Sequence, residues 1–296
     1  MDRVVAAGPG GRGAVGRHPA RDARAAEGER IVTGIGIAVG QFAPTADKRA
    51  NLAEIERLAR AAKDRGARLA LFPEYSSFFV NPMDETLVAN AEPVNGPFVA
   101  RLIELAGALD MHLVAGLIET GDAGRVRNTA VAVDGGGVVA LYRKQHLYDA
   151  FGQRESDWVE PGGLEPPQTF AVDGLTVGLM TCYDLRFPEL SRTIVDAGAE
   201  LLLVPAEWVR GPLKEHHWST LLEARAIENT VFVAAADHPA PIGVGRSAVI
   251  DPQGVALAAL GADPGLAVAW VDREAIERTR AVNPALRLRR YRVTTG

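Results

Sequence analysis

Two spacings of apolar residues alternate along the chain from position 31 onward. Short apolar or alternating runs predict buried strands, and runs at helical spacing predict amphipathic helices. The predicted strands cover 35–42, 68–72, 112–118, 129–133, 138–142, 177–180, 200–208, 230–236, 247–251, 255–259 and 267–271. The predicted helices run from Asp47 to Gly66, over 97–109, from 187 onward, over 218–228 and over 272–280. This order predicts one α/β domain with two mixed β-sheets flanked by helices, an αββα sandwich.

Residues 1–30 differ from the rest of the chain. They contain no Leu, Ile or Phe and many Gly, Ala and Arg residues. Such a segment cannot bury enough apolar surface to offset the entropy that is lost on ordering. We therefore expect a disordered N-terminal extension over 1–30 that carries no chemistry, and one folded domain over 31–296.

The composition of the chain narrows the classes of protein that it fits. Hydrophobic residues make up 47% of it, ample for a packed core, yet no apolar run reaches the roughly 20 residues that a membrane-spanning helix needs. The net charge of -5 gives no reason to expect a nucleic-acid partner. The single cysteine cannot form an internal disulfide, and we therefore expect a reducing, cytoplasmic location.

That cysteine, Cys182, follows one predicted buried strand and precedes a helix that opens at Phe187-Pro-Glu-Leu190. A strand-to-helix turn can hold a side chain exposed, close to backbone N–H groups and to the positive end of a helix. A thiol there should ionise more easily, and the thiolate is the reactive form. Taken alone, a lone cysteine is more often a small buried hydrophobic residue, so the interpretation depends on the rest of the chain.

Two more ionisable residues lie just past predicted strands. Glu74 follows the strand that Pro73 stops, and Lys144 follows the strand over 138–142. Open α/β sheets place their ligands at the carboxyl ends of strands. Either residue alone could be an ordinary surface charge. Lysine is rare in this chain, however, and each retained lysine merits inspection: Lys48, Lys63, Lys144 and Lys214.

Taken together, these segments resemble the nitrilase superfamily of carbon–nitrogen hydrolases. Phe72-Pro-Glu74 matches the glutamate motif of that family, and Tyr142-Arg-Lys-Gln-His-Leu-Tyr148 matches its lysine motif. Cys182-Tyr-Asp-Leu-Arg-Phe-Pro-Glu-Leu190 closely matches its cysteine motif. The three motifs stand in the family order, and the resemblance covers residues 31–292. The resemblance thus identifies 31–296 as a carbon–nitrogen hydrolase domain that needs no metal and no cofactor.

The resemblance also implies roles for these residues. Cys182 would attack an amide to form a thioester, while Glu74 would move the protons. Lys144 and the backbone N–H of Tyr183 would stabilise the oxyanion. The family uses a second glutamate in the loop after the lysine, and Glu155 fits that position because Glu155-Ser156 precedes Pro161-Gly162. In the same loop, Glu160 is the weaker candidate.

The substrate is less closely defined. The cysteine motif is most similar to the ω-amidase and deaminated-glutathione-amidase branch, although Trp208-Val-Arg-Gly-Pro-Leu-Lys214 departs from the pattern of that branch. Arg186 could pair with a substrate carboxylate or with a neighbouring Asp or Glu. Trp208 and Tyr148 are candidate pocket walls.

Several functions therefore stay open. The first is an amidase that releases ammonia from a small carboxylated amide, using water as the second substrate. The alternatives are hydrolysis of N-carbamoyl groups, hydrolysis of nitriles and a non-catalytic binding protein on the same fold. By resemblance we also expect a homodimer or a larger homo-oligomer. In it, the basic, lightly apolar segment 286–292 would pack on a partner subunit.

Overall fold

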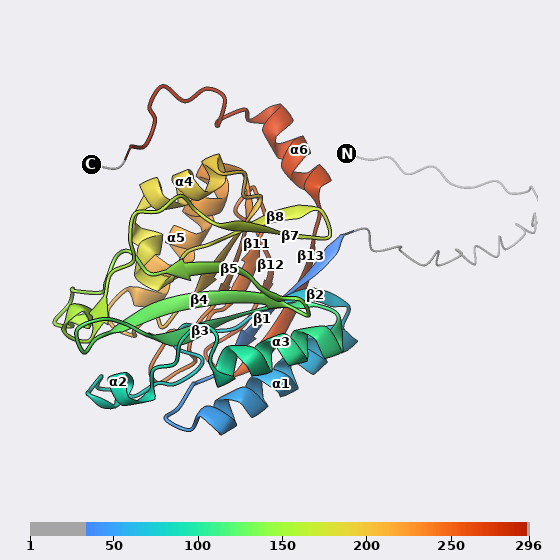
Figure 1. Ribbon diagram of the computed structural model, residues 1–296. Helices are drawn as coiled ribbons and strands as arrows, with labels where there is room; N and C mark the ends of the chain where they lie inside the picture. Colours follow the sequence, from blue (N-terminus) through green and yellow to red (C-terminus); the bar gives the residue numbers. More distant parts are fainter. Residues whose placement is uncertain (1–33, 295–296) are drawn as a thin grey trace, which may run out of the picture. The chain divides into compact units, whose positions relative to one another are not determined.

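Two mixed β-sheets carry the strands of the chain. The computed structural model describes residues 34–294 (Figure 1), so the predicted extension over 1–30 lies outside the described residues. The first sheet has the order β13-β1-β2-β3-β4-β5, with β6 beside β4. Its strands are β1 (Ile35–Gln41), β2 (Ala67–Leu71), β3 (His112–Thr120), β4 (Val126–Asp134), β5 (Gly137–Arg143), β6 (Val159–Glu160) and β13 (Gly265–Val271).

The second sheet has the order β12-β11-β10-β9-β8-β7. Its strands are β7 (Thr169–Val172), β8 (Leu175–Leu179), β9 (Leu201–Pro205), β10 (Phe232–Ala236), β11 (Ala248–Ile250) and β12 (Ala256–Ala259). The predicted strand over 200–208 ends earlier than expected, at Pro205. The strands β6 and β7, of two and four residues, are too short for apolar spacing to predict.

Helices cover the outer face of each sheet (Figure 1). The helices α1 (Lys48–Asp64) and α3 (Pro97–Leu109) pack on the first sheet. The helices α4 (Pro188–Asp196) and α5 (Lys214–Asn229) pack on the second sheet. Two further helices, α2 (Thr86–Asn90) and α6 (Arg273–Val282), complete the set among the described residues. The predicted αββα sandwich is confirmed.

The alternation along β1 shows how the sequence builds the layers. Ile37 and Val39 lie in the cluster between the two sheets, together with residues such as Val177 and Leu203 of the second sheet. Ala38, between them in the sequence, belongs instead to the cluster under α1 and α3. Successive side chains of a strand point to opposite faces, so a strand buried on both faces is apolar throughout.

The ends of α1 follow the predicted signals. Asp47 Oδ1 accepts hydrogen bonds from the backbone N–H groups of Arg49 (2.9 Å) and Ala50 (3.1 Å), which caps the first turn. At the other end, Gly66 adopts a positive φ of 83° and its N–H donates to the Lys63 carbonyl. Glycine adopts this left-handed conformation without the strain that a Cβ would bring.

Parallel pairing brings the carboxyl ends of neighbouring strands to one edge of each sheet. In the first sheet β2 runs parallel to β3, and in the second β8, β9 and β10 are parallel. Glu74 follows β2, and Cys182 follows β8. A Cβ at Gly116 of β3 would lie only 2.3 Å from the backbone nitrogen of Tyr75, so glycine there lets the chain after β2 pass close to β3.

Candidate active site

A cavity of about 330 Å³ opens at this edge of the sheets. Small-molecule sites in proteins begin at about this size. All eight residues that the sequence proposes for chemistry or substrate contact line the cavity: Glu74, Lys144, Tyr148, Glu155, Cys182, Tyr183, Arg186 and Trp208. The structure therefore brings together residues that are up to 134 positions apart in the chain, from 74 to 208.

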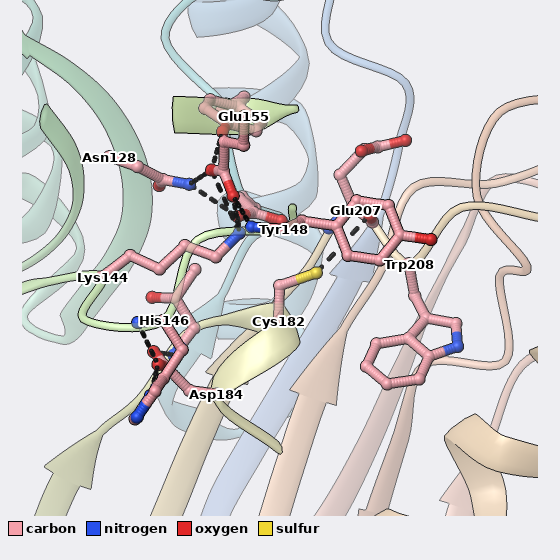
Figure 2. Close-up of polar contacts among 12 residues, drawn as sticks. Asn128, Lys144, His146, Tyr148, Glu155, Cys182, Asp184, Glu207 and Trp208 are labelled. Carbon is pink, nitrogen blue, oxygen red and sulfur yellow. Dashed lines mark hydrogen bonds and ion pairs between the residues drawn. The ribbon is translucent and has the colours of Figure 1, made fainter. Parts of the chain in front are cut away.

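The floor of the cavity holds one ammonium between two carboxylates (Figure 2). Lys144 Nζ donates to Glu74 Oε1 at 2.9 Å and to Glu155 Oε2 at 2.8 Å, and all three side chains are buried. Burial alone would lower the pKa of Lys144, but Glu155 and Glu74 outweigh it and hold that pKa well above its usual value. Lys144 therefore keeps its positive charge at neutral pH.

Four contacts fix the position of Glu74. Its Oε1 accepts from Asn128 Nδ2 (2.6 Å) as well as from Lys144, and its Oε2 accepts from the backbone N–H of Glu207 (2.6 Å). Its backbone carbonyl accepts from His238 Nε2 at 2.8 Å. Burial lowers the pKa of His238 to about 4, so the imidazole is neutral and donates its one N–H here.

Of the two candidate glutamates in the loop after Lys144, Glu155 is the one in the cavity. It starts the 3₁₀ turn η1 (Glu155–Asp157), and the backbone N–H of Tyr148 donates to its Oε2 at 2.6 Å. Burial would raise the pKa of Glu155, but Lys144 lowers it below the usual value. Glu160 instead pairs with Arg127 at 2.6 Å. Glu155, the glutamate that the sequence favours, is therefore the one that lies beside Lys144.

Cys182 starts the 3₁₀ turn η2 (Cys182–Arg186) and adopts a positive φ of 48°. Its side chain is only 4% exposed, and Sγ donates to the backbone carbonyl of Glu207 at 3.5 Å. Burial, followed by the charge of Glu74, raises the pKa of Cys182 well above its usual value, and Lys144 offsets this only in part. The expectation of an exposed and easily ionised thiol is wrong, because the turn lies under the cavity walls.

This burial gives a testable property of the free protein. A free thiol is about one-tenth ionised one unit below its pKa, whereas a buried thiol with a raised pKa holds much less thiolate. We expect iodoacetamide to alkylate Cys182 at pH 7.5 at least about tenfold more slowly than free cysteine, with the rate still rising at pH 9.5. Intact-mass measurement gives the rate, because Cys182 is the one cysteine of the chain. A rate that levels off below pH 7 would contradict the raised pKa.

A buried carboxylate joins the lysine motif to the cysteine turn. Asp184 Oδ1 accepts from the backbone N–H (3.0 Å) and from Nδ1 (2.7 Å) of His146, as Figure 2 shows. Its Oδ2 accepts from the Thr181 N–H (3.1 Å) and from the Tyr142 hydroxyl (2.8 Å). The His146 ring stacks on Phe187 at 3.7 Å between centroids, so this histidine has a structural role.

We expect Asp184→Ala to lower the free energy of unfolding by about 3–5 kcal/mol, because it removes the buried acceptor of several hydrogen bonds at once. Urea unfolding measures this change. Asp64→Ala serves as the control: Asp64 is an exposed carboxylate at the end of α1, where a surface substitution changes stability by about 0.5 kcal/mol or less. Equal effects of the two substitutions would contradict the role of Asp184 as the link between the lysine motif and the cysteine turn.

Arg186 forms part of the outer wall. Its guanidinium carbon lies 4.9 Å from the centroid of the Trp208 ring and 5.8 Å from that of Tyr183, and Nη2 lies 3.3 Å from His217 Nδ1. Among residues 34–294 it forms no ion pair with a carboxylate, and its buried Nε has no hydrogen-bond partner. Of the two readings left open by the sequence, a structural salt bridge is therefore excluded within this range.

The model of the carbon-nitrogen hydrolase family matches residues 36–281, which is most of the chain. The chain belongs to the carbon–nitrogen hydrolase family. A deaminated glutathione amidase of Escherichia coli O157:H7 is 40% identical over 255 residues, covering 86% of this hydrolase and 97% of that protein. A deaminated glutathione amidase of Mus musculus is 37% identical over 273 residues, covering 86% and 83% respectively.

Solved structures agree with this family. A mutant of the Nesterenkonia AN1 amidase from the nitrilase superfamily matches this hydrolase with a TM-score of 0.72 and 31% identity, over 86% of this chain and 97% of that chain. In another structure of that amidase acrylamide has added to the active-site cysteine; it matches with a TM-score of 0.69 and 30% identity, over 86% and 100%. The predicted nitrilase-superfamily membership is confirmed, and the protein is a cysteine-dependent carbon–nitrogen hydrolase.

The cavity of the hydrolase also contains residues for which the sequence predicts no role, among them Lys214 and Glu207. In the sequence, Lys214 stands out only as one of four lysines, and Glu207 only as part of the predicted strand over 200–208. Burial and the neighbouring charge of Glu74 raise the pKa of Glu207 well above its usual value. The one signal in the sequence is position. Lys214 ends the segment 208–214 and Glu207 directly precedes it, and this segment departs from the pattern of the ω-amidase and deaminated-glutathione-amidase branch.

Two kinds of feature are absent from the residues of the hydrolase that the structure describes: a cluster of metal-binding side chains and a membrane-spanning helix. Within 34–294, no three His, Cys, Asp or Glu side chains are grouped so that they could hold a metal ion. None of the helices in this range combines the length and the apolar character that crossing a membrane requires.

Proposed function

We propose that this protein hydrolyses the C–N bond of a small, carboxylate-bearing amide through a thioester on Cys182 and releases ammonia. One observation carries the proposal: Lys144 Nζ lies between Glu74 and Glu155 on the floor of the cavity that Cys182 lines. An unactivated amide is a poor electrophile, so its hydrolysis needs a nucleophile, a proton carrier and an oxyanion donor in one place.

The first half-reaction transfers the acyl group to sulfur. Cys182 Sγ attacks the amide carbon as its proton passes to a Glu74 oxygen, which is required because the buried thiol is protonated at neutral pH. Lys144 Nζ and the backbone N–H of Tyr183 stabilise the oxyanion of the tetrahedral intermediate. Glu74 then gives the proton to the amide nitrogen, the C–N bond breaks, ammonia leaves and a thioester remains.

The second half-reaction returns the enzyme to its starting state. Glu74 takes a proton from a water molecule, whose oxygen attacks the thioester carbon. The C–S bond of the tetrahedral intermediate breaks, the thiolate of Cys182 regains the proton from Glu74, and the carboxylic acid product leaves. Glu155 acts through Lys144, as a positioning residue, because its carboxylate contacts Nζ at 2.8 Å and 3.1 Å.

The carboxylate on the substrate is proposed from Arg186. This guanidinium lines the cavity and forms no ion pair with a carboxylate among residues 34–294, so a substrate carboxylate would be its partner. The names of the relatives support an amidase with a nucleophilic cysteine: two are deaminated glutathione amidases, and the active-site cysteine of the Nesterenkonia amidase has added to acrylamide in a Michael addition.

A panel of substrates tests the proposal. Wild type should release ammonia from glutaramate faster than from the uncharged hexanamide. Arg186→Ala should lower kcat/KM for glutaramate by about 10–100-fold, the value of a charge-assisted hydrogen bond, and should affect hexanamide less. Equal losses would exclude the carboxylate contact. Release of carbon dioxide from an N-carbamoyl amino acid, or of ammonia from a nitrile alone, would select those alternatives. No turnover of any compound would favour a binding protein.

We further propose that the enzyme is a homodimer or a larger homo-oligomer in the reducing cytoplasm. The segment after α6 leaves apolar side chains in solvent, with Leu288 70% and Tyr291 90% exposed, and such side chains favour an interface. A reduced thiol, which the chemistry needs, persists in the cytoplasm. Light scattering after size exclusion should give twice the chain mass of 31.5 kDa or more, and less after deletion of 286–296. A monomer at micromolar concentration would contradict the assembly.

A further inference from the structure

Lys214 is a buried cation in the outer wall of the cavity. It begins α5, it is 5% exposed, and its Nζ donates to the hydroxyl of Tyr148 at 2.6 Å. Burial raises the pKa of Tyr148 to about 12, so the partner is an uncharged phenol. Nζ also lies 3.8 Å from the centroid of the Phe151 ring. Among the described residues Lys214 forms no ion pair with a carboxylate.

Arg186 and Lys214 share the same aromatic surroundings. The Arg186 guanidinium lies 5.7 Å from the centroid of Phe151 and 4.9 Å from that of Trp208, and Lys214 Nζ lies 3.8 Å and 5.8 Å from the same two rings. Two like charges are thus held over one pair of rings. Burial, and then the charge of Arg186, lowers the pKa of Lys214, as expected for cations that repel each other.

No carboxylate in residues 34–294 forms an ion pair with Arg186 or Lys214. Glu207 also lines the cavity, but it forms no ion pair with either cation in this range. Burial, and then the charge of Glu74, raises the pKa of the Glu207 carboxyl well above its usual value, which disfavours its charged form. The rings attract the cations, yet a cation–π contact returns only about 0.5–2 kcal/mol, less than the cost of desolvating a charge. The arrangement is therefore incomplete without an anion.

We propose that Lys214 and Arg186 together bind the substrate carboxylate, which makes Lys214 a specificity-determining residue of this enzyme. The inference rests on the proposed function and deepens it, since it assigns the acid group of the substrate to two cations. Arg186 offers its buried, unpartnered Nε–H, and Lys214 offers the remaining protons of its ammonium group. The aromatic rings hold both side chains in place before the substrate arrives, which reduces the entropy lost on binding.

Three variants separate charge from shape. Lys214→Met keeps the length of the side chain and removes its charge, Lys214→Arg keeps the charge, and Lys63→Met removes a lysine at the end of α1, away from the cavity lining. We expect Lys214→Met to lower kcat/KM for glutaramate about tenfold or more, chiefly through KM, and to lower that for hexanamide much less. Lys214→Arg should restore most of the preference for glutaramate, and Lys63→Met should match wild type.

Binding of glutarate provides a readout that does not need turnover. In a Cys182→Ala background, calorimetry should show glutarate binding, and adding Lys214→Met should raise its Kd about tenfold. Equal loss on both amides, or an unchanged Kd for glutarate in a folded Lys214→Met protein, would overturn the role of Lys214. Absence of ammonia release by wild type from any amide would instead overturn the proposed function, while the calorimetry would still decide whether the two cations bind a carboxylate.

Discussion

Replacing Cys182 with alanine should abolish amide hydrolysis, with a loss of at least about 10⁴-fold in kcat, the range seen when a nucleophile is removed from other hydrolases. Glu74 and Lys144 would still be in place, but no thioester could form. The chain has no second cysteine that could substitute. Ammonia release under saturating amide measures the loss, and the residual rate reports what the base and the oxyanion donors achieve with water alone.

Two controls keep this result specific. Cys182→Ser retains the size and the hydrogen-bonding capacity of the side chain, and it should also lose most activity because a hydroxyl ionises far less readily than a thiol. Thermal unfolding should show that both variants stay folded, since each removes or exchanges one atom in the small space under the cavity. More than a tenth of the wild-type activity in Cys182→Ser would contradict the nucleophile assignment.

Lys144→Met should damage both activity and folding. It removes the ammonium that lies 2.9 Å from Glu74 and 2.8 Å from Glu155, and leaves two buried carboxylates side by side. Breaking a buried ion pair from one side costs about 3–5 kcal/mol. Loss of the proposed oxyanion donor should lower kcat by about 10²–10³-fold in whatever fraction stays folded. Urea unfolding and ammonia release measure the two effects separately.

The stability loss in this variant should depend on pH in a defined direction. In wild type, Lys144 holds the pKa of Glu155 below its usual value. The ionised carboxylate therefore stabilises the fold when the pH is above the usual pKa of a glutamate, and this contribution is lost as the pH falls. In Lys144→Met the largest effect that opposes burial is removed, while the hydrogen bonds from Tyr75 and Tyr148 still lower the pKa of Glu155. We expect burial to outweigh them, so that this pKa rises above its unfolded value. Stability is then retained at low pH and lost as pH rises.

The difference between the two proteins should therefore be larger at pH 8 than at pH 5. Adding Glu155→Gln to Lys144→Met should recover part of the loss at pH 8, because it removes one of the two unpaired charges. Equal destabilisation at both pH values, or no recovery in the double variant, would show that the three groups do not act as one charged cluster.

The sequence alone predicts the layers of the fold and the residues on the floor of the cavity. Apolar periodicity located β1, α1 and α3 because these elements are buried along a continuous face or stripe, and Asp47 and Gly66 supplied local end signals. Placing Glu74, Lys144 and Cys182 in one cavity needed more than periodicity. It required the strand-end rule together with three motifs in the order of a known family.

The remaining features depend on contacts between distant parts of the chain. Burial of Cys182 follows from walls such as Trp208, which no local pattern around the cysteine reveals. Lys214 contacts Tyr148 across 66 positions, and Asp184 contacts Tyr142 across 42. The residues beside Lys214 do not indicate a buried ammonium, because the same local sequence is typical of an exposed helix start. Such roles emerge only when the tertiary structure supplies the partners.

Trapping the acyl-enzyme tests the central claim most directly. Wild type should be mixed with glutaramate, quenched with acid during turnover and measured by intact-mass spectrometry, followed by digestion to locate any adduct. We expect a mass increase equal to the glutaryl group on the peptide that contains Cys182, removed by hydroxylamine and absent from Cys182→Ala. Turnover without any adduct under rapid quenching, or an adduct on another residue, would contradict a thioester at Cys182.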